Sequence, residues 1–214
     1  MTDEGSLVRA AYESVREAVL TRRLRPGERV TVRPLAERLG ISPTPVKAAL
    51  AILEREGFLV ARKHSGFFVA KLTAADMRDV YELRSAVDAL AAREVARTRP
   101  PDLLDRLREL LERQRAAVEA GDITRYAELD RAFHATIWQG SPNRRLPAIA
   151  DLLGAQLQLG QNLTITVPGR PEASLDEHAE ILEALAAGDT AAAEQATRRH
   201  VARVIRALES ALDG

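Results

Sequence analysis

Apolar side chains recur with helical spacing along the first part of the sequence. Val8, Tyr12, Val15 and Val19 share one helical face, and the segment RPGERV then interrupts the helix. A second, shorter helix is predicted over VRPLAERL, and Gly40 stops it. The pattern therefore predicts two helices joined by a turn ahead of position 41.

Ser42, Pro43 and Pro45 indicate where a third helix begins. Ser42 is a favoured N-cap residue. A proline in the first turn removes no hydrogen bond, because the backbone N–H groups there have no acceptor within the helix. Apolar residues then recur on one face as far as the residues before Gly57. The sequence predicts a helix that starts sharply at these prolines.

The period changes after Gly57, where FLVA and FFVA flank the basic segment RKHSG. Two short apolar runs around a polar turn predict a β-hairpin with a basic tip. Helix, short helix, tight turn, helix and hairpin together predict a winged helix-turn-helix DNA-binding domain over residues 5–71. The alternative is a helical hairpin with solvated charges.

From Thr73 onward the sequence is rich in Ala and Leu and has a helical period. Ser174 and Glu177 have the spacing of a capping box, which marks a helix start. Six helices are predicted, at 74–98, 102–120, 122–139, 143–163, 172–187 and 190–212. The fold class is therefore mostly α, with an N-terminal winged helix-turn-helix followed by an all-α antiparallel helical bundle over residues 73–213.

Composition and charge narrow the classes of protein. Cys is absent, which excludes disulfides and thiolate metal sites. No run of about 18 apolar residues is present, and the acidic start MTDEG does not fit a signal peptide. Residues 1–70 include 12 basic and 8 acidic residues, whereas the remainder of the chain includes 19 basic and 23 acidic residues. We expect a cytoplasmic protein with no membrane partner, whose weakly basic front part faces a polyanion.

The predicted DNA-binding domain suggests its own contacts. In a winged helix-turn-helix the second helix of the motif enters the major groove with its N-terminal end, and the wing lies against the minor groove or phosphates. Thr44 and Lys47 suit phosphate or base-edge contacts, and Arg33 can reach the DNA backbone. The candidate DNA-binding residues are Arg33, Ser42, Thr44, Lys47, Arg62, Lys63, His64 and Gly66.

Three histidines, His134, His178 and His200, fall on the apolar faces of three different predicted helices. Asp130 precedes His134 by four residues, so both side chains point the same way from one helix. Three imidazoles and a carboxylate that converge in a bundle core would form a divalent metal site. Hydrogen-bonded core histidines without a metal are the alternative.

Arg84 lies on the apolar face of the first helix of the bundle. A buried guanidinium needs an anionic partner. Asp88, one turn later, and the carboxylate of a bound ligand are both candidates. Trp138, which is the only tryptophan, is expected in the core.

The order of the N-terminal motifs resembles the GntR family of bacterial transcription regulators. RPGERV, LAERLGIS, TPV, EGF and GFFVA carry this resemblance over residues 7–71. Family members commonly have Arg after the capping Ser, and Arg then Glu after the Pro-Val pair. This sequence has Pro43, Lys47 and Ala48 at those positions, so the resemblance does not define the operator sequence.

The helical part is similar to the ligand-binding domain of the FadR subfamily of these regulators, the type called FCD. ELDRAFHATIW, SPNRRL, SLDEHAEILEAL and RRHV carry this resemblance. It implies a bound divalent metal, with zinc preferred over manganese or nickel, and a small organic acid whose carboxylate fills the open coordination positions. It also implies a homodimer held by the helical domain. The implied metal ligands are Asp130, His134, His178 and His200, with Arg84 as the effector-binding residue.

The predicted function is a metabolite-responsive transcription regulator that binds double-stranded operator DNA. Two alternatives stay open at this point. One is a metal-dependent, hydrolase-like enzyme, because three His and one Asp with open positions could activate water. The other is a regulator with a purely structural metal. Glu128 and Glu180 point off the ligand faces, which leaves no evident general base, so no enzymatic activity is expected.

Overall fold

The computed structural model of the chain describes residues 4–63, 65–71 and 73–213. Most of these residues are helical, as the sequence predicts. The chain divides into two compact units, residues 1–73 with 154–159 and residues 74–153 with 160–214. No helix in the described ranges combines the length and apolar character that a membrane span requires.

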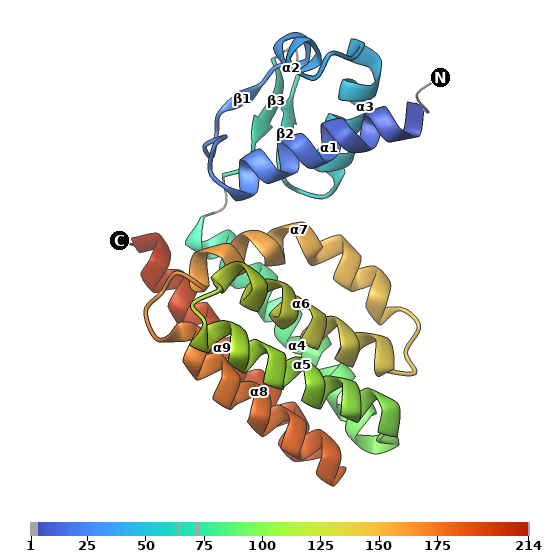
Figure 1. Cartoon of the computed structure of the whole chain (residues 1–214), viewed down its shortest axis with the longest axis vertical. Coiled ribbons are helices and arrows are strands. Elements are labelled where there is room, and N and C mark those ends of the chain that lie inside the picture. Colours follow the sequence, from blue (N-terminus) through green and yellow to red (C-terminus); the bar gives the residue numbers. More distant parts are fainter. Residues whose placement is uncertain (1–3, 64, 72, 214) are drawn as a thin grey trace. The chain divides into compact units, whose positions relative to one another are not determined.

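The first unit combines helices with a small antiparallel sheet (Figure 1). The strand order is β1-β3-β2, so β3 lies between its two neighbours. The strand β1 was not predicted, because its two residues read as part of a turn and form a strand only by pairing with β3. The elements are α1 (Glu4–Leu20), β1 (Arg29–Val30), α2 (Val32–Leu39), α3 (Pro43–Arg55), β2 (Leu59–Arg62) and β3 (Gly66–Val69).

The start of α3 follows the sequence prediction. Ser42 is the N-cap residue with an extended backbone, and prolines occupy the first turn. The Ser42 side chain makes no capping hydrogen bond, so the fixed φ of the prolines, rather than a cap, defines this start. Gly40 ends α2 with a φ of 65°, a left-handed conformation that glycine adopts without strain.

Burial on one side of α3 fixes which side chains stay outside. Val46, Leu50 and Leu53 are fully buried and belong to the same core as Val15 of α1. Burying each such side chain stabilises the fold by about 1.5–3 kcal/mol. The opposite side of α3, which carries Thr44 and Lys47, therefore faces solvent.

The second unit is an antiparallel helical bundle (Figure 1). Its helices α4 and α9 pack side by side, as do α5 with α6 and α8 with α9. The predicted helix bounds agree with the observed ones to within three residues. The helices are α4 (Ala74–Thr98), α5 (Pro101–Glu119), α6 (Ile123–Gly140), α7 (Leu146–Thr164), α8 (Arg170–Ala187) and α9 (Thr190–Asp213).

The start of α8 differs from the prediction. The helix begins at Arg170, after Gly169 in a left-handed conformation, with Pro171 in the first turn. Ser174 and Glu177 therefore lie inside the helix, where both are buried. The capping-box interpretation of this pair is wrong, because the Gly-Arg-Pro sequence supplies an earlier start. The Glu177 side chain therefore does not cap the helix and can contact other groups in the core.

Candidate DNA-binding surface and metal centre

The candidate residues of the helix-turn-helix lie on open surface. Thr44 and Lys47, on the first turns of α3, are both exposed, and so is Ser42 at the N-cap. Arg33 is exposed in the first turn of α2. Their side chains are therefore available to a bound polyanion without rearrangement of the core.

The wing adds further exposed positive charge. Arg62 ends β2, Gly66 begins β3, and Lys63 lies between them. The Arg62 guanidinium lies 4.4 Å from the centre of the Phe68 ring, a cation–π contact that holds it on the face of the hairpin. His64, the remaining wing candidate, lies outside the described residues.

Arg29 on β1 was missed by the sequence reasoning. A Cβ placed on Gly66 would lie 3.9 Å from Arg29 Nε, so this guanidinium lies beside the wing. Gly66 itself has a φ of 92°, which only glycine adopts readily. Arg29 could not be assigned to the wing from the sequence, because its strand forms only through distant pairing.

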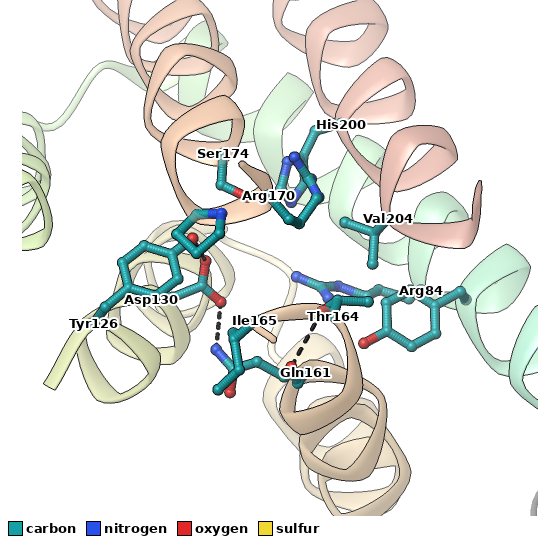
Figure 2. Close-up of a pocket in the computed structure, with 12 residues that line it drawn as sticks. Arg84, Tyr126, Asp130, Gln161, Thr164, Ile165, Arg170, Ser174, His200 and Val204 are labelled. Carbon is teal, nitrogen blue, oxygen red and sulfur yellow. Dashed lines mark hydrogen bonds between the residues drawn. The ribbon is translucent and has the colours of Figure 1, made fainter. Parts of the chain in front are cut away.

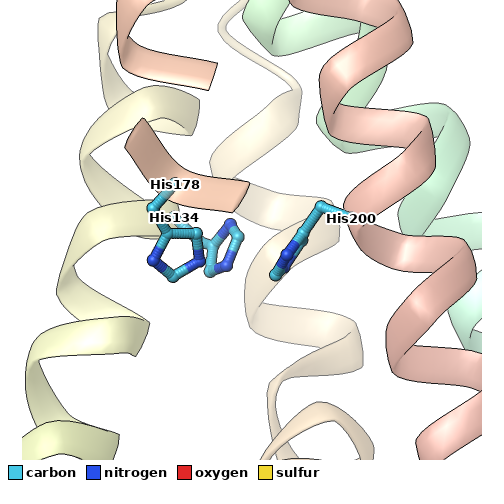
Figure 3. Close-up of side chains that lie close together, drawn as sticks. All are labelled: His134, His178 and His200. Atoms are coloured by element: carbon cyan, nitrogen blue, oxygen red, sulfur yellow. The ribbon is translucent and has the colours of Figure 1, made fainter. Parts of the chain in front are cut away.

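The three predicted histidines converge in the core of the bundle (Figure 3). His134 comes from α6, His178 from α8 and His200 from α9, and all three are buried. One ring nitrogen of each lies within 4.8 Å of those of the other two. Two nitrogens on one tetrahedral zinc ion at about 2.1 Å lie about 3.4 Å apart. The nitrogens therefore need to approach one another by up to about 1.4 Å to share an ion.

Two nitrogens of this cluster have no hydrogen-bond partner in the described part of the chain. They are Nε2 of His134 and Nε2 of His178. Burial, followed by the charge of Arg84, lowers the pKa of His134 well below its ordinary value. Burial and the neighbouring His200 do the same to the pKa of His178. A buried, neutral and unpaired imidazole nitrogen costs about 1–3 kcal/mol, and it is the form that ligates a metal.

Asp130 lies beside the histidine cluster. Its Oδ1 is 3.6 Å from His178 Nε2 and accepts a hydrogen bond of 3.4 Å from the Tyr126 hydroxyl. Its Oδ2 accepts a hydrogen bond of 2.6 Å from the amide of Gln161, on α7. The structure thus brings the fourth predicted ligand to the edge of the cluster. Gln161 could not be predicted from the sequence, because it lies on α7, 31 residues after Asp130 along the chain.

A small cavity adjoins the cluster (Figure 2). Its wall includes Arg84, Asp130, Arg170 and His200, which come from four different helices. The cavity has a volume of about 20 Å³, which is room for roughly one water molecule. A larger occupant would require movement of the wall.

Arg84 has an anionic partner within the bundle. Its Nε donates to Asp88 Oδ2 over 3.1 Å, and both side chains are buried. Trp138 Nε1 donates to the other Asp88 oxygen over 2.6 Å, which makes Trp138 a core residue as predicted. Burial would lower the pKa of the Arg84 guanidinium, but the Asp88 carboxylate raises it, so Arg84 stays charged at the cavity wall.

Glu177 is the largest omission of the sequence reasoning. It accepts two hydrogen bonds from Arg170, of 3.0 and 2.7 Å, and one of 2.7 Å from His200 Nδ1. Burial would raise the pKa of the Glu177 carboxyl, but hydrogen bonds from His200 and Arg170 outweigh this effect and lower it to about 2. Its position directly before a histidine on an apolar helix face is the signal that could have found it.

A winged helix-turn-helix joined to a bundle of this kind defines a class of bacterial transcription regulator. The profile of bacterial regulatory proteins of the gntR family matches residues 7–69, and that of the FCD domain matches residues 79–203. The chain therefore belongs to the GntR family and carries an FCD domain. The resemblance inferred from the sequence is confirmed.

Relatives extend along nearly the whole chain. It is 28% identical to the HTH-type transcriptional regulator YdhC of Bacillus subtilis (strain 168), over 88% of this chain and 85% of that protein. It is 31% identical to the probable D-xylose utilization operon transcriptional repressor of Paenarthrobacter nicotinovorans, over 86% of this chain and 81% of that protein. The solved structure of E. coli McbR/YncC has a TM-score of 0.78 at 24% identity and covers 96% of this chain and 98% of its own. The matched family is one of bacterial regulatory proteins, and the first two relatives are named as transcription regulators, in agreement with the predicted regulator.

Proposed function

We propose that this GntR-family regulator holds a divalent metal in its helical unit and binds a small organic acid beside it. Zinc is the expected metal, with manganese or nickel as substitutes. The observation that carries the proposal is the buried cluster of three histidines, two of which have an unpaired Nε2. A divalent ion would satisfy these nitrogens, and neutral imidazoles suit such ions.

His134, His178 and His200 would be the histidine ligands, and Asp130 the carboxylate ligand. When bound, the metal supplies open coordination positions that a carboxylate can fill. Tyr126 and Gln161 hold the Asp130 carboxylate at the edge of the cluster, through the hydrogen bonds that they donate. The four groups come from three helices, so their convergence depends on the packed bundle.

Two guanidinium groups support an acid as the ligand of the cavity. Arg84 and Arg170 both line it, and Arg170 Nε has no hydrogen-bond partner in the described part of the chain. We propose Arg84 as the residue that binds the acid. Its guanidinium would either leave Asp88 for the ligand carboxylate or bind both carboxylates. The cavity must open to admit such a ligand, and Gln161 and Thr164 of α7 form one side of it.

Control of transcription would follow if the acid binds two arrangements of the protein with unequal affinity. The acid needs to bind one arrangement of the protein better than another, and this difference limits the size of the effect. We propose a cytoplasmic homodimer that presents two copies of α3 to two operator half-sites. Thr44 and Lys47 would contact the major groove, and Arg62 and Lys63 of the wing the neighbouring phosphates or minor groove.

The small size of the cavity favours a second candidate, a purely structural metal. In that case the metal stabilises the bundle and no acid binds. A thermal-shift screen of carboxylic acids with the metal-loaded protein separates the two candidates. Stabilisation by an acid that disappears in Arg84→Ala supports the effector, whereas no response to any acid supports the structural metal.

The metal itself is tested by elemental analysis of purified protein after reconstitution with zinc, manganese and nickel in turn. We expect about one ion per chain, absent in His134→Ala and much reduced in His178→Ala and His200→Ala. His64→Ala is the matched control, because it removes the one histidine outside the helical unit. Equal metal content in all four variants would contradict the proposed site.

A further inference from the structure

Two of the three clustered histidines present Nδ1 to an acceptor on another helix. His200 Nδ1 lies 2.7 Å from Glu177 Oε2, and His178 Nδ1 lies 2.8 Å from Gln114 Oε1. Glu177 and Gln114 are buried, with exposed fractions of 2% and 0%. Neither residue was among the candidates from sequence.

The chemistry of Glu177 fixes the proton on His200. An ionised carboxylate only accepts hydrogen bonds, so in a neutral His200 the proton must sit on Nδ1. Nε2 then carries the lone pair. The carboxylate cannot readily turn away, because Arg170 holds both of its oxygens and Arg203 Nη1 lies 3.3 Å from Oε1.

The amide of Gln114 has the same effect on His178 for a different reason. An amide can present either a donor or an acceptor. Here its Nε2 lies 3.4 Å from the carbonyl oxygen of Leu129, which turns Oε1 towards His178. The proton of His178 therefore also sits on Nδ1. This agrees with a His178 Nε2 that has no hydrogen-bond partner in the described residues.

We propose that Glu177 and Gln114 are positioning residues that set the Nδ1–H tautomers of His200 and His178 before any metal binds. Both Nε2 lone pairs are thereby kept available to a metal. The role proposed for these tautomers rests on the proposed metal function, whereas the hydrogen bonds that set them do not depend on it. Residues that hold a metal-ligating histidine from behind typically change metal affinity by about 10- to 100-fold.

His134 provides a contrast within the same cluster. Its Nδ1 is 3.9 Å from Asp88 Oδ2, which is too long for a hydrogen bond. The oxygens of Asp88 already accept from Arg84 and Trp138. The tautomer of His134 is therefore not set in this way, and we expect a mixture of both forms in the metal-free protein.

The tautomers can be read directly in the metal-free, full-length protein. Long-range ¹H–¹⁵N NMR of ¹⁵N-histidine-labelled protein, at about pH 8 and so above the ordinary pKa of histidine, distinguishes a proton on Nδ1 from one on Nε2. The chain has four histidines, so each signal is assigned by its loss in one alanine variant. We expect His178 and His200 to carry the proton on Nδ1.

Two variants distinguish the effects of the two positioning residues. In Glu177→Gln the new amide can donate as well as accept, so His200 should become a mixture while His178 stays unchanged. In Gln114→Met the acceptor is lost, so His178 should become a mixture while His200 stays unchanged. Zinc affinity, measured against a competing chelator, should fall by about 10- to 100-fold in each.

Glu180→Gln is the matched control on the same helix. Glu180 is exposed and ion-paired with Arg199 over 3.2 Å, so its change should alter neither the tautomers nor the zinc affinity. A parent protein with the His200 proton on Nε2 would overturn the inference, even if both variants failed to fold. Unchanged tautomers and zinc affinity within twofold in folded Glu177→Gln would also overturn it. Expected tautomers in a parent that binds no metal would uphold the positioning and reject the metal function.

Discussion

Lys47 lies on the open surface of α3, whereas His200 and Glu177 are buried in the bundle and bonded to each other. The candidate residues of the winged unit thus contribute little to its core, and those of the helical unit are part of the core. Surface substitutions usually change the free energy of unfolding by less than about 0.5 kcal/mol. Removing one partner of a buried charged pair costs about 3–5 kcal/mol. In the first unit binding and stability should separate on mutation, and in the second they should change together.

The largest expected effect is that of Arg170→Met. It leaves the buried Glu177 carboxylate without the two hydrogen bonds of Arg170. We expect the free energy of unfolding to fall by about 3–5 kcal/mol, measured by urea denaturation. Arg33→Met, an exposed site in the winged unit, is the control and should change it by less than about 0.5 kcal/mol. Equal effects of the two variants would remove the contrast between the units.

Metal should stabilise the helical unit by mass action. At a free zinc concentration of 100 to 1,000 times Kd, the gain in the free energy of unfolding is about 2.7–4.1 kcal/mol. Trp138, the only tryptophan, belongs to this unit and makes its fluorescence a selective probe of unfolding. His200→Ala should greatly reduce the zinc-dependent shift in Tm. A shift of the same size in that variant would place the metal elsewhere.

Lys47→Ala should act on DNA binding alone. If Lys47 contacts a phosphate, affinity falls about equally for all DNA sequences, and the slope of log K against log salt decreases by about one. A salt titration of operator binding measures both. Arg108→Ala, an exposed site on α5, serves as the control for lost positive charge. A salt slope that is the same in the parent and in Lys47→Ala would reject the proposed docking of α3.

The smallest effect concerns the three tyrosines. Burial and the hydrogen bond to Glu56 raise the pKa of Tyr12 to about 12. Burial also raises the pKa values of Tyr81 and Tyr126, both in the bundle. An absorbance titration of the folded protein should therefore show little phenolate near pH 10, the ordinary pKa of tyrosine.

The sign of the corresponding change in stability follows from these shifts. A tyrosine with a raised folded pKa stays protonated in the folded protein while the unfolded chain ionises. Its contribution to stability is complete below pH 10 and is lost, for Tyr12, as the pH rises from 10 to about 12. Phenylalanine in place of Tyr12 should flatten this part of the stability curve. Phenolate absorption with an ordinary midpoint in the folded parent would contradict the environments described for these residues.

Local signals explain how much of the fold could be predicted. Glycine and proline breaks fixed the bundle helices to within three residues, because helix ends depend on a few adjacent positions. The strand β1 could not be predicted, because its two residues become a strand only by pairing with Phe67 and Phe68 of β3. The start of α8 was misplaced because two start signals lie close together, and the one at Gly169 and Pro171 prevails.

The candidate site likewise contains residues that local signals could predict and residues that they could not. The histidines and Asp130 could be proposed from spacing, because one apolar face on each helix limits where those side chains point. Gln114 and Gln161 could not, since each acts on a residue of another helix and depends on how the helices pack. Whether Asp88 pairs with Arg84 was left open by the sequence and is decided by their packed geometry.

X-ray absorption at the zinc edge of reconstituted protein tests the central claim most directly. We predict one zinc environment with three nitrogen ligands at about 2.0–2.1 Å and at least one oxygen ligand at about 2.0–2.2 Å. The outer-shell scattering should show the imidazole pattern of His134, His178 and His200, and it should drop to two imidazoles or vanish in His178→Ala. A zinc environment with fewer than three imidazoles in the parent, or one unchanged in His178→Ala, would contradict the proposed metal centre.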